Sequence, residues 1–213
     1  MGKAVPKQFL LLQGKPLIWY SLESFLKAYT DLEIILVLPD GYHQTGKGIV
    51  ESTSGPDRIR IINGGATRFY SVKNGLEFVQ RPSIVFIHDG VRCLLSTSLI
   101  HRCYNMALVN GSAIPAIGAI DSMRLVTDKG SEVLDRSKVR FLQTPQTFRS
   151  EIVKTAYQQD YSELFTDDAS VVEQLGVAIQ LVEGEEENVK MTRPIDLLIM
   201  EQILENRSLQ KQG

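Results

Sequence analysis

Residues 33–39, EIILVLP, form a continuous run of β-branched residues and leucine that ends at Pro39. A run of this length is typical of a strand buried on both faces, as in a parallel sheet. Similar runs recur at 58–62, 83–87 and 113–117, and helical patterns separate most of them. The alternation predicts an open, mostly parallel, doubly wound (Rossmann-like) α/β sheet with helices on both faces.

Helices are predicted between these strands and near both ends of the chain. Pro16 opens an amphipathic pattern, and proline suits a first helical turn. Further helices are predicted at 48–54, 67–79, 97–109, 149–158, 167–175 and from Pro194 onward, with one more strand at 177–182. Thr166 or Asp167 is expected to cap the helix that Gly176 ends.

The alternation breaks between 118 and 142. Two extended segments, 121–128 and 131–143, flank Lys129-Gly130, which is a turn signal. The length of 213 residues suits one domain better than two. We therefore expect a single domain over 1–213, from which residues 118–142 protrude as a β-hairpin arm.

Composition excludes several classes of protein. Lys and Arg total 23 against 25 Asp and Glu, so no net basic field exists to hold a nucleic acid or an anionic membrane. No apolar run approaches the ~20 residues of a membrane span. Cys93 and Cys103 lack the spacing of a disulfide framework or a zinc site. We expect a reduced, cytoplasmic protein.

The start of the sequence departs from the usual nucleotide-binding pattern. Doubly wound sheets of that kind begin with a strand that feeds a glycine-rich phosphate loop. This sequence begins in a loop and runs into a helix. Either the chain as given lacks its first strand or the site is built otherwise. A missing inner strand would leave unpaired backbone edges on two neighbours, at a cost of several kcal/mol.

Ligands of open α/β sheets bind beyond the carboxyl ends of the strands, so the residues found there are candidates for a site. His88, Asp89, Gly90 and Arg92 follow the run at 83–87. Asp89 suits a divalent cation or a ribose hydroxyl, and Arg92 suits a phosphate. Asp89 could equally cap a local turn.

Two glycine-containing segments also follow strands. Residues 63–68, with Gly64 and Gly65, could present backbone N–H groups to a base or phosphate, or form a plain turn and N-cap. Residues 41–47 match G-x-x-x-x-G-K, but Gly48 stands where a Ser or Thr hydroxyl would bind Mg²⁺. We interpret 41–47 as a surface connection rather than a P-loop.

Basic residues form a second set of candidates: Lys7, Arg92, Arg136, Lys190 and Arg193. Each of them taken singly could be a solvated surface charge. Lys190, however, lies between the last strand and the last helix, at the sheet edge to which Asp89 belongs. Several cations that converge there would suit a substrate carrying more than one phosphate.

Eight motifs in this order together resemble the 2-C-methyl-D-erythritol 4-phosphate cytidylyltransferase family of the non-mevalonate isoprenoid pathway. They are P-K-Q (6–8), G-G-x-x-R-x-x-S-V (64–72), H-D-G-V-R (88–92), D-S-M (121–123), D-R (135–136), Q-T-P-Q-x-F (143–148), T-D-D-A-S (166–170) and N-V-K-M-T-R-P-x-D-L (188–197). Their order and spacing over 6–197 are far more specific than any single motif.

The resemblance implies a homodimer, joined through the arms, that binds CTP, Mg²⁺ and methylerythritol phosphate. Lys7 would contact the CTP phosphates, Asp89 would bind the metal, and Lys190 would position the sugar phosphate. The substrate-binding residues that it implies are Gly64, Gly65, Ser71, Gly90, Arg92, Ser122, Arg136 and Thr166. Arg136 would reach the sugar phosphate from the neighbouring subunit.

The resemblance departs at the start, because the family begins with a strand and a loop of the type A-A-G-x-G-x-R-M-G. Only Met1-Gly2 of that signature is present. We expect that Met1 is an internal methionine taken as the start or that the chain is truncated. A truncated, non-catalytic dimeric binding protein is therefore an alternative to an active enzyme.

The reaction implied is the attack of a phosphate-monoester oxygen on the α-phosphorus of CTP, with pyrophosphate as leaving group. No general base is required, because a monoester with a second pKa near 6 is largely dianionic at neutral pH. A ribitol-5-phosphate cytidylyltransferase is the nearest alternative. Asp135-Arg136 and the K-x-T-R-P segment at 190–194 favour methylerythritol phosphate.

Overall fold

The computed structural model describes residues 5–209. Its helices are α1 (Leu17–Ala28), α2 (His43–Glu51), α3 (Arg68–Leu76), α4 (Thr97–Asn110), α5 (Ser150–Ala156), α6 (Asp168–Glu173) and α7 (Pro194–Leu209). Its strands are β1 (Leu11–Leu12), β2 (Lys15–Pro16), β3 (Ile34–Leu38), β4 (Ile59–Asn63), β5 (Ile84–Ile87), β6 (Ser112–Gly118), β7 (Met123–Thr127), β8 (Gly130–Leu134), β9 (Arg140–Leu142), β10 (Gln146–Arg149) and β11 (Leu181–Glu183). Short 3₁₀ helices are η1 (Lys7–Phe9), η2 (Pro56–Arg58) and η3 (Arg136–Lys138).

The largest sheet has the strand order β11-β6-β10-β5, and β9 also pairs with β6. β11 runs parallel to β6, whereas β10 runs antiparallel to both β5 and β6. β5, β6 and β11 therefore point in one direction. The α/β class is confirmed, but the antiparallel strand β10 was missed by the sequence analysis.

β10 escaped prediction because its sequence, QTFR, shows no strand periodicity. Gln146, Thr147 and Phe148 are nevertheless all buried. The Gln146 side chain accepts a hydrogen bond from the Ala169 N–H at 2.8 Å and donates one to Asp167 Oδ2 at 2.8 Å. A polar side chain can stand at the centre of a sheet when its hydrogen bonds are satisfied, and hydrophobic patterns cannot reveal this.

The sheet is interrupted between β3 and β5. β3 pairs in parallel with β4, and β5 pairs with β10, but no strand pairing joins the two sheets within residues 5–209. A cleft of about 2040 Å³ is lined by residues of both β3 and β5 and by α1 and α3. The structure thus contains two strand edges that face a cleft, and the missing first strand itself stays a prediction.

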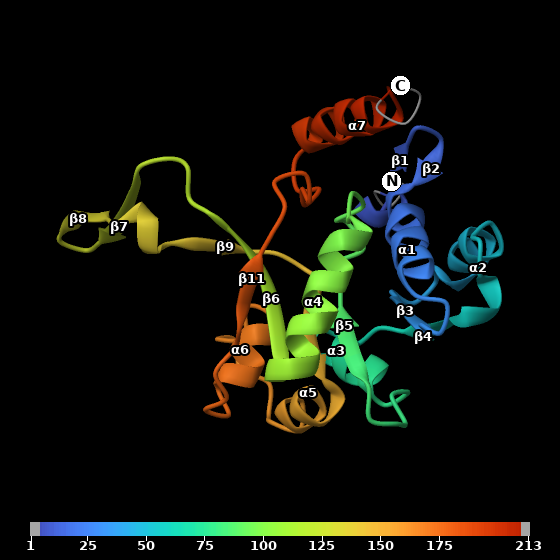
Figure 1. Cartoon of the computed structure of the whole chain (residues 1–213), viewed down its shortest axis with the longest axis horizontal. Coiled ribbons are helices and arrows are strands. Elements are labelled where there is room, and N and C mark those ends of the chain that lie inside the picture. Colours follow the sequence, from blue (N-terminus) through green and yellow to red (C-terminus); the bar gives the residue numbers. More distant parts are fainter. Residues whose placement is uncertain (1–4, 210–213) are drawn as a thin grey trace.

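Helices cover both faces of the large sheet (Figure 1). Ile114 of β6 packs with Phe148 and residues of α3, α5 and α6 in one apolar cluster. The adjacent Ala113 packs with α1 and α4 in another. Consecutive strand residues point to opposite faces, so β6 carries both layers of the core.

β7 and β8 form a hairpin that extends well away from the rest of the molecule (Figure 1). The second predicted extended segment is broken by η3, which the Asp135 side chain caps by accepting the Ser137 N–H. β9 then returns the chain to β6. Val126 and Val133 on the hairpin are 80% and 75% exposed.

Two predicted boundaries were wrong. α2 begins at His43 rather than 48, because Gly46, Ile49 and Val50 form a buried helical face. Residues 43–47 are therefore helical, and they form no phosphate loop. The last strand spans 181–183 rather than 177–182, since parallel pairing with β6 begins at Leu181. Within the described part of the chain, no helix has the length and apolarity needed to cross a membrane.

Candidate active site

Asp89 lies just beyond the end of β5, at the wall of the cleft between the two sheets. Lys190 Nζ is 2.7 Å from Asp89 Oδ2, and Arg68 Nε is 3.4 Å from Oδ1. Burial alone would raise the pKa of Asp89, but the charges of Arg68 and Lys190 outweigh it and lower that pKa. Asp89 is therefore an ionised carboxylate held between two cations.

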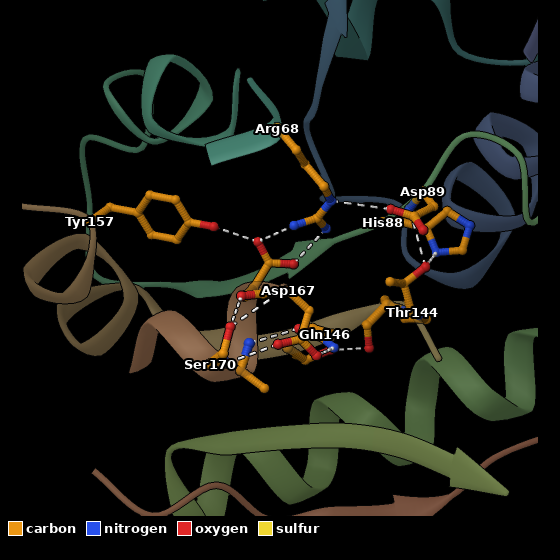
Figure 2. Close-up of polar contacts among 12 residues, drawn as sticks. Arg68, His88, Asp89, Thr144, Gln146, Tyr157, Asp167 and Ser170 are labelled. Atoms are coloured by element: carbon orange, nitrogen blue, oxygen red, sulfur yellow. Dashed lines mark hydrogen bonds and ion pairs between the residues drawn. The ribbon is translucent and has the colours of Figure 1, made fainter. Parts of the chain in front are cut away.

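A second carboxylate lies behind Arg68. Asp168, the first residue of α6, is fully buried and accepts from Arg68 Nη1 at 2.8 Å and from Nη2 at 2.6 Å. Its Oδ1 also accepts the Tyr157 hydroxyl at 2.5 Å. Figure 2 shows Arg68 between Asp89 on one side and the carboxylate that contacts Tyr157 on the other. Arg68, Asp89, Asp168 and Lys190 together are called the Asp89 cluster below.

The backbone of Asp89 is held by the buried Thr144 side chain, which in turn bonds the half-buried His88 (Figure 2). The Asp89 N–H donates to Thr144 Oγ1 at 3.1 Å, and Thr144 Oγ1 lies 3.0 Å from His88 Nδ1. His88 Nε2 lies 3.0 Å from the Arg92 carbonyl oxygen. That carbonyl can only accept, so Nε2 carries the proton and Nδ1 accepts from the Thr144 hydroxyl. Burial lowers the pKa of His88 to about 4, which keeps the ring neutral.

Lys190 is carried by the segment 184–193, called the Lys190 loop, which connects β11 to α7. Arg92 Nη1 donates to the Asn188 carbonyl at 2.7 Å, and Asn188 Nδ2 donates to the Thr144 carbonyl at 2.9 Å. The Met191 N–H donates to the Val91 carbonyl at 3.0 Å. These bonds hold the loop against the segment that carries Asp89.

The charge of Arg92 is not balanced by a carboxylate of the described residues. Its Nε is buried and has no hydrogen-bond partner among residues 5–209. Burial lowers its pKa, although a guanidinium remains charged at neutral pH. The ion pairs found in the described residues do not include Arg92. Its charge is therefore available to an anion.

Lys7 lies on η1, and its Nζ donates to the Thr192 carbonyl of the Lys190 loop at 2.5 Å. Its neighbour Gln8 approaches Gly90, where an added Cβ would lie 3.9 Å from Gln8 Cβ. The three cations Lys7, Arg92 and Lys190 therefore meet around one loop, as the sequence analysis expected. Their roles in binding and catalysis stay predictions.

Gly64 and Gly65 follow β4, a strand of the smaller β3-β4 sheet. The Gly64 N–H donates to the Leu38 carbonyl at 2.8 Å, and the Gly65 N–H donates to Ser71 Oγ at 3.0 Å. A Cβ at Gly65 would lie 2.4 Å from Tyr70 Cβ, and one at Gly90 would lie 3.1 Å from Ile18 Cδ1. Close packing therefore explains both Gly65 and Gly90.

Among residues 5–209, the remaining predicted residues make no hydrogen bond or ion pair with the Asp89 cluster. Ser122 and Arg136 are exposed at the root of the arm, where Arg136 Nη1 donates to the Ile120 carbonyl. Thr166 is exposed and precedes Asp167, the N-cap of α6, by one residue. The chain order thus places Thr166 beside the cluster and Ser122 and Arg136 on a separate element.

The prediction left out Arg68, Asp168 and Tyr157 as site residues. Arg68 is the arginine of the G-G-x-x-R motif, and Asp168 lies in T-D-D-A-S, so both motifs contained the signal. No sequence signal marked Tyr157 as a site residue, because a tyrosine in a helical pattern is by default a core residue. Only the fold brings residues 68, 157 and 168 together.

Comparisons with known proteins identify the family of the chain. The family model described as IspD, 2-C-methyl-D-erythritol 4-phosphate cytidylyltransferase, matches residues 1–206. A relative of that name from Bacteroides thetaiotaomicron is 45% identical over 199 residues, which cover 93% of this chain and 91% of the relative.

Solved structures resemble the chain over a similar extent. A 4-diphosphocytidyl-2C-methyl-D-erythritol synthase from Anaerococcus prevotii matches with a TM-score of 0.82 and 27% identity, covering 92% of this chain and 88% of that one. A 2-C-methyl-D-erythritol 4-phosphate cytidylyltransferase from Thermus thermophilus matches with a TM-score of 0.76 and 30% identity, covering 95% of both. The chain belongs to the 2-C-methyl-D-erythritol 4-phosphate cytidylyltransferase family of nucleotidyltransferases.

Proposed function

We propose that the Asp89 cluster is the centre at which this enzyme transfers CMP from CTP to 2-C-methyl-D-erythritol 4-phosphate, releasing pyrophosphate. The observation that carries the proposal is that Lys7, Arg92 and Lys190 meet at the Lys190 loop, where Lys190 pairs with Asp89 at the wall of the cleft. The family match supports methylerythritol phosphate rather than ribitol phosphate as acceptor.

The nucleotide occupies the side of the cleft formed by Gly64, Gly65 and Ser71. Ser71 Oγ accepts the Gly65 N–H and donates to the Thr67 carbonyl, so this turn is rigid before a base arrives. Gly90, which leaves little room for a side chain, keeps the backbone beside Asp89 close to the ligand. Lys7 contacts the triphosphate from η1.

The sugar phosphate occupies the side formed by Arg92, Lys190 and Thr166. Arg92 carries the unpartnered Nε described above, and Lys190 presents an ammonium on a loop that the fold holds in place. Ser122 and Arg136 reach the same substrate from the arm, Arg136 coming from a second copy of the chain. The exposed Val126 and Val133 support an arm that packs on a partner.

The donor set of this site fits a divalent cation, Mg²⁺, that is bound through a single protein carboxylate. Mg²⁺ binds through one or two carboxylates and completes its shell with water and substrate phosphates. Asp168 is committed to Arg68 and Tyr157, and no group of three or more metal-binding side chains occurs in residues 5–209. Asp89 would hold the cation together with the CTP phosphates, and the cation would neutralise charge on the triphosphate.

The residues of this chain act by placing and neutralising charge. The acceptor phosphate needs no general base, because it is mostly dianionic at neutral pH. Lys190 and Arg92 orient one acceptor oxygen toward the α-phosphorus, and Lys7 draws charge toward the leaving pyrophosphate. Because His88 stays neutral, it supports the Asp89 backbone without adding charge.

We also propose the organisation that the sequence suggested. Residues 1–213 form one nucleotidyltransferase domain, with 118–142 as the arm of a homodimer. The two buried, free thiols Cys93 and Cys103 are consistent with a reducing cytoplasm.

Alanine variants at Lys190 and Arg136 test the assignment of the sugar phosphate. Each should lower kcat/KM for methylerythritol phosphate by about 100-fold or more, while the Kd for CTP rises by a much smaller factor, because both charges are assigned to the acceptor phosphate and only Lys190 also pairs with Asp89. Steady-state kinetics and CTP calorimetry measure the two effects. Equal losses for both substrates would contradict these roles.

A further inference from the structure

Arg68 uses three nitrogens on two different carboxylates. Nη1 and Nη2 donate to the two oxygens of Asp168 at 2.8 and 2.6 Å, and Nε reaches Asp89 Oδ1 at 3.4 Å. A guanidinium is planar, so a bidentate pair fixes the direction in which its third N–H group points. The approach of Arg68 to Asp89 is therefore set by Asp168.

Asp168 is anchored in the interior. Its side chain is 0% exposed, whereas that of Arg68 is 41% exposed at the cleft. The Tyr157 hydroxyl donates to Asp168 Oδ1, and the next residue, Ala169, donates its N–H to Gln146 of β10. Asp168 and Tyr157 thus form a fixed support on which Arg68 rests.

This arrangement leaves Asp89 partly open. Arginine beside a carboxylate favours a bidentate pair that occupies both oxygens. Here Asp168 takes the bidentate contact, and Asp89 receives a single, longer one from Arg68 and another from Lys190. A carboxylate offers about four acceptor positions, so Asp89 retains capacity toward the cleft.

We propose that Asp168 and Tyr157 are positioning residues that keep Arg68 from forming a bidentate pair with Asp89. Arg68 then steadies Asp89 through one N–H group and leaves its oxygens open to ligands. The inference rests on the proposed role of Asp89. An ion pair that served only to join α3 to α6 would have no effect on Asp89, whereas this inference predicts such an effect.

Asp168→Asn is the informative variant, because it keeps the size of the side chain and removes the charge that holds Arg68. Released Arg68 should turn to Asp89 and lower kcat by about 10–100-fold, while KM for CTP changes by less than about threefold. Adding Arg68→Gln to this variant should restore part of kcat, because the side chain that covers Asp89 is then gone.

Tyr157→Phe should give a smaller loss of the same kind. Tyr161→Phe is the matched control, since Tyr161 belongs to the same aromatic group, is 40% exposed and lies outside the hydrogen bonds of Asp168. Melting temperatures show which variants fold. If Asp168→Asn does not fold, the comparison of Tyr157→Phe with Tyr161→Phe decides.

Two results would overturn the inference: a folded Asp168→Asn variant with kcat within about twofold of the parent, or a double variant no faster than Asp168→Asn alone. An Asp89→Asn variant distinguishes a failure of the proposed function from a failure of the positioning role. Normal kcat in Asp89→Asn would remove the proposed function, whereas loss there with normal kcat in Asp168→Asn would remove the positioning role only.

Discussion

The Asp89 cluster and the arm carry residues predicted for one site, yet the side chains of the two regions differ in how many contacts they make within the chain. In the cluster each charged side chain contacts another element of the same chain: Arg68 contacts Asp168, and Lys190 contacts Asp89. On the arm, Arg136 contacts only the nearby Ile120 carbonyl among the hydrogen bonds of the described residues, and Ser122 is exposed.

This difference separates two ways of building a site. The cluster is assembled by the packing of one chain, so its geometry exists before substrate binds. The arm presents exposed apolar and basic groups, and the proposed function assigns these groups to the site of a second copy of the chain. Under the proposed function, the groups of the Asp89 cluster are preorganised and those of the arm are supplied when two copies assemble.

The largest effect is expected in the cluster. Asp89→Asn should lower kcat by about 1,000-fold, because it removes the charge that Lys190 and Arg68 balance and the carboxylate that would bind the metal. Assays of pyrophosphate release, stopped at fixed times, measure the loss of kcat.

Asp40→Asn is the matched control, since Asp40 also follows a strand, β3, but is exposed, and within residues 5–209 its side chain accepts a hydrogen bond only from the Gly41 N–H. Its kcat should equal that of the parent. Similar losses in both variants would show that the cluster has no special part in the reaction.

A moderate effect is expected on the arm. If the proposed dimer forms through the arm, Val126→Lys with Val133→Lys should dissociate it and reduce activity more at low than at high protein concentration, since charges would enter an apolar interface. Sedimentation velocity measures the mass, with Val109→Lys, 73% exposed on α4, as the control. An unchanged dimer would remove the arm from the interface.

The smallest effect concerns the support of the Lys190 loop. The Asp196 side chain accepts the Arg193 N–H at 2.6 Å and both the N–H and hydroxyl of Thr192 at 2.7 Å. These bonds lower the pKa of Asp196. Asp196→Asn should reduce the free energy of unfolding at pH 7 by about 1 kcal/mol, measured by urea denaturation.

The pH dependence of the free energy of unfolding tests whether the ionised carboxylate of Asp196 causes that loss. A lowered pKa stabilises the folded state above the ordinary carboxyl pKa of about 4, and the benefit disappears as pH falls through the lower folded value. The difference between Asp196→Asn and the parent should therefore shrink below pH 4. Glu205→Gln, exposed on the same helix, should show no difference at either pH.

Strands with continuous apolar runs and helices with marked starts, such as β3, β5 and α7, were predictable because their signals are local. Asp89 and Lys190 could be placed at one sheet edge for the same reason, since each follows a predicted strand. β10 and the pair of Arg68 with Asp168 could not, because buried polar groups are recognisable only once their distant partners are known. Met1 and Gly2, on which the prediction about the start of the chain rests, lie outside the described part of the chain.

Mixing two inactive variants tests the central claim that a cluster in one chain and an arm from another form the site. A mixture of Lys190→Ala and Arg136→Ala subunits, equilibrated by dilution and reassociation, contains mixed dimers with one intact site. We expect recovery of about one quarter of the parental activity, since about half of the dimers are mixed and one of the two sites in each is intact. A mixture that stays as inactive as its two components would contradict it.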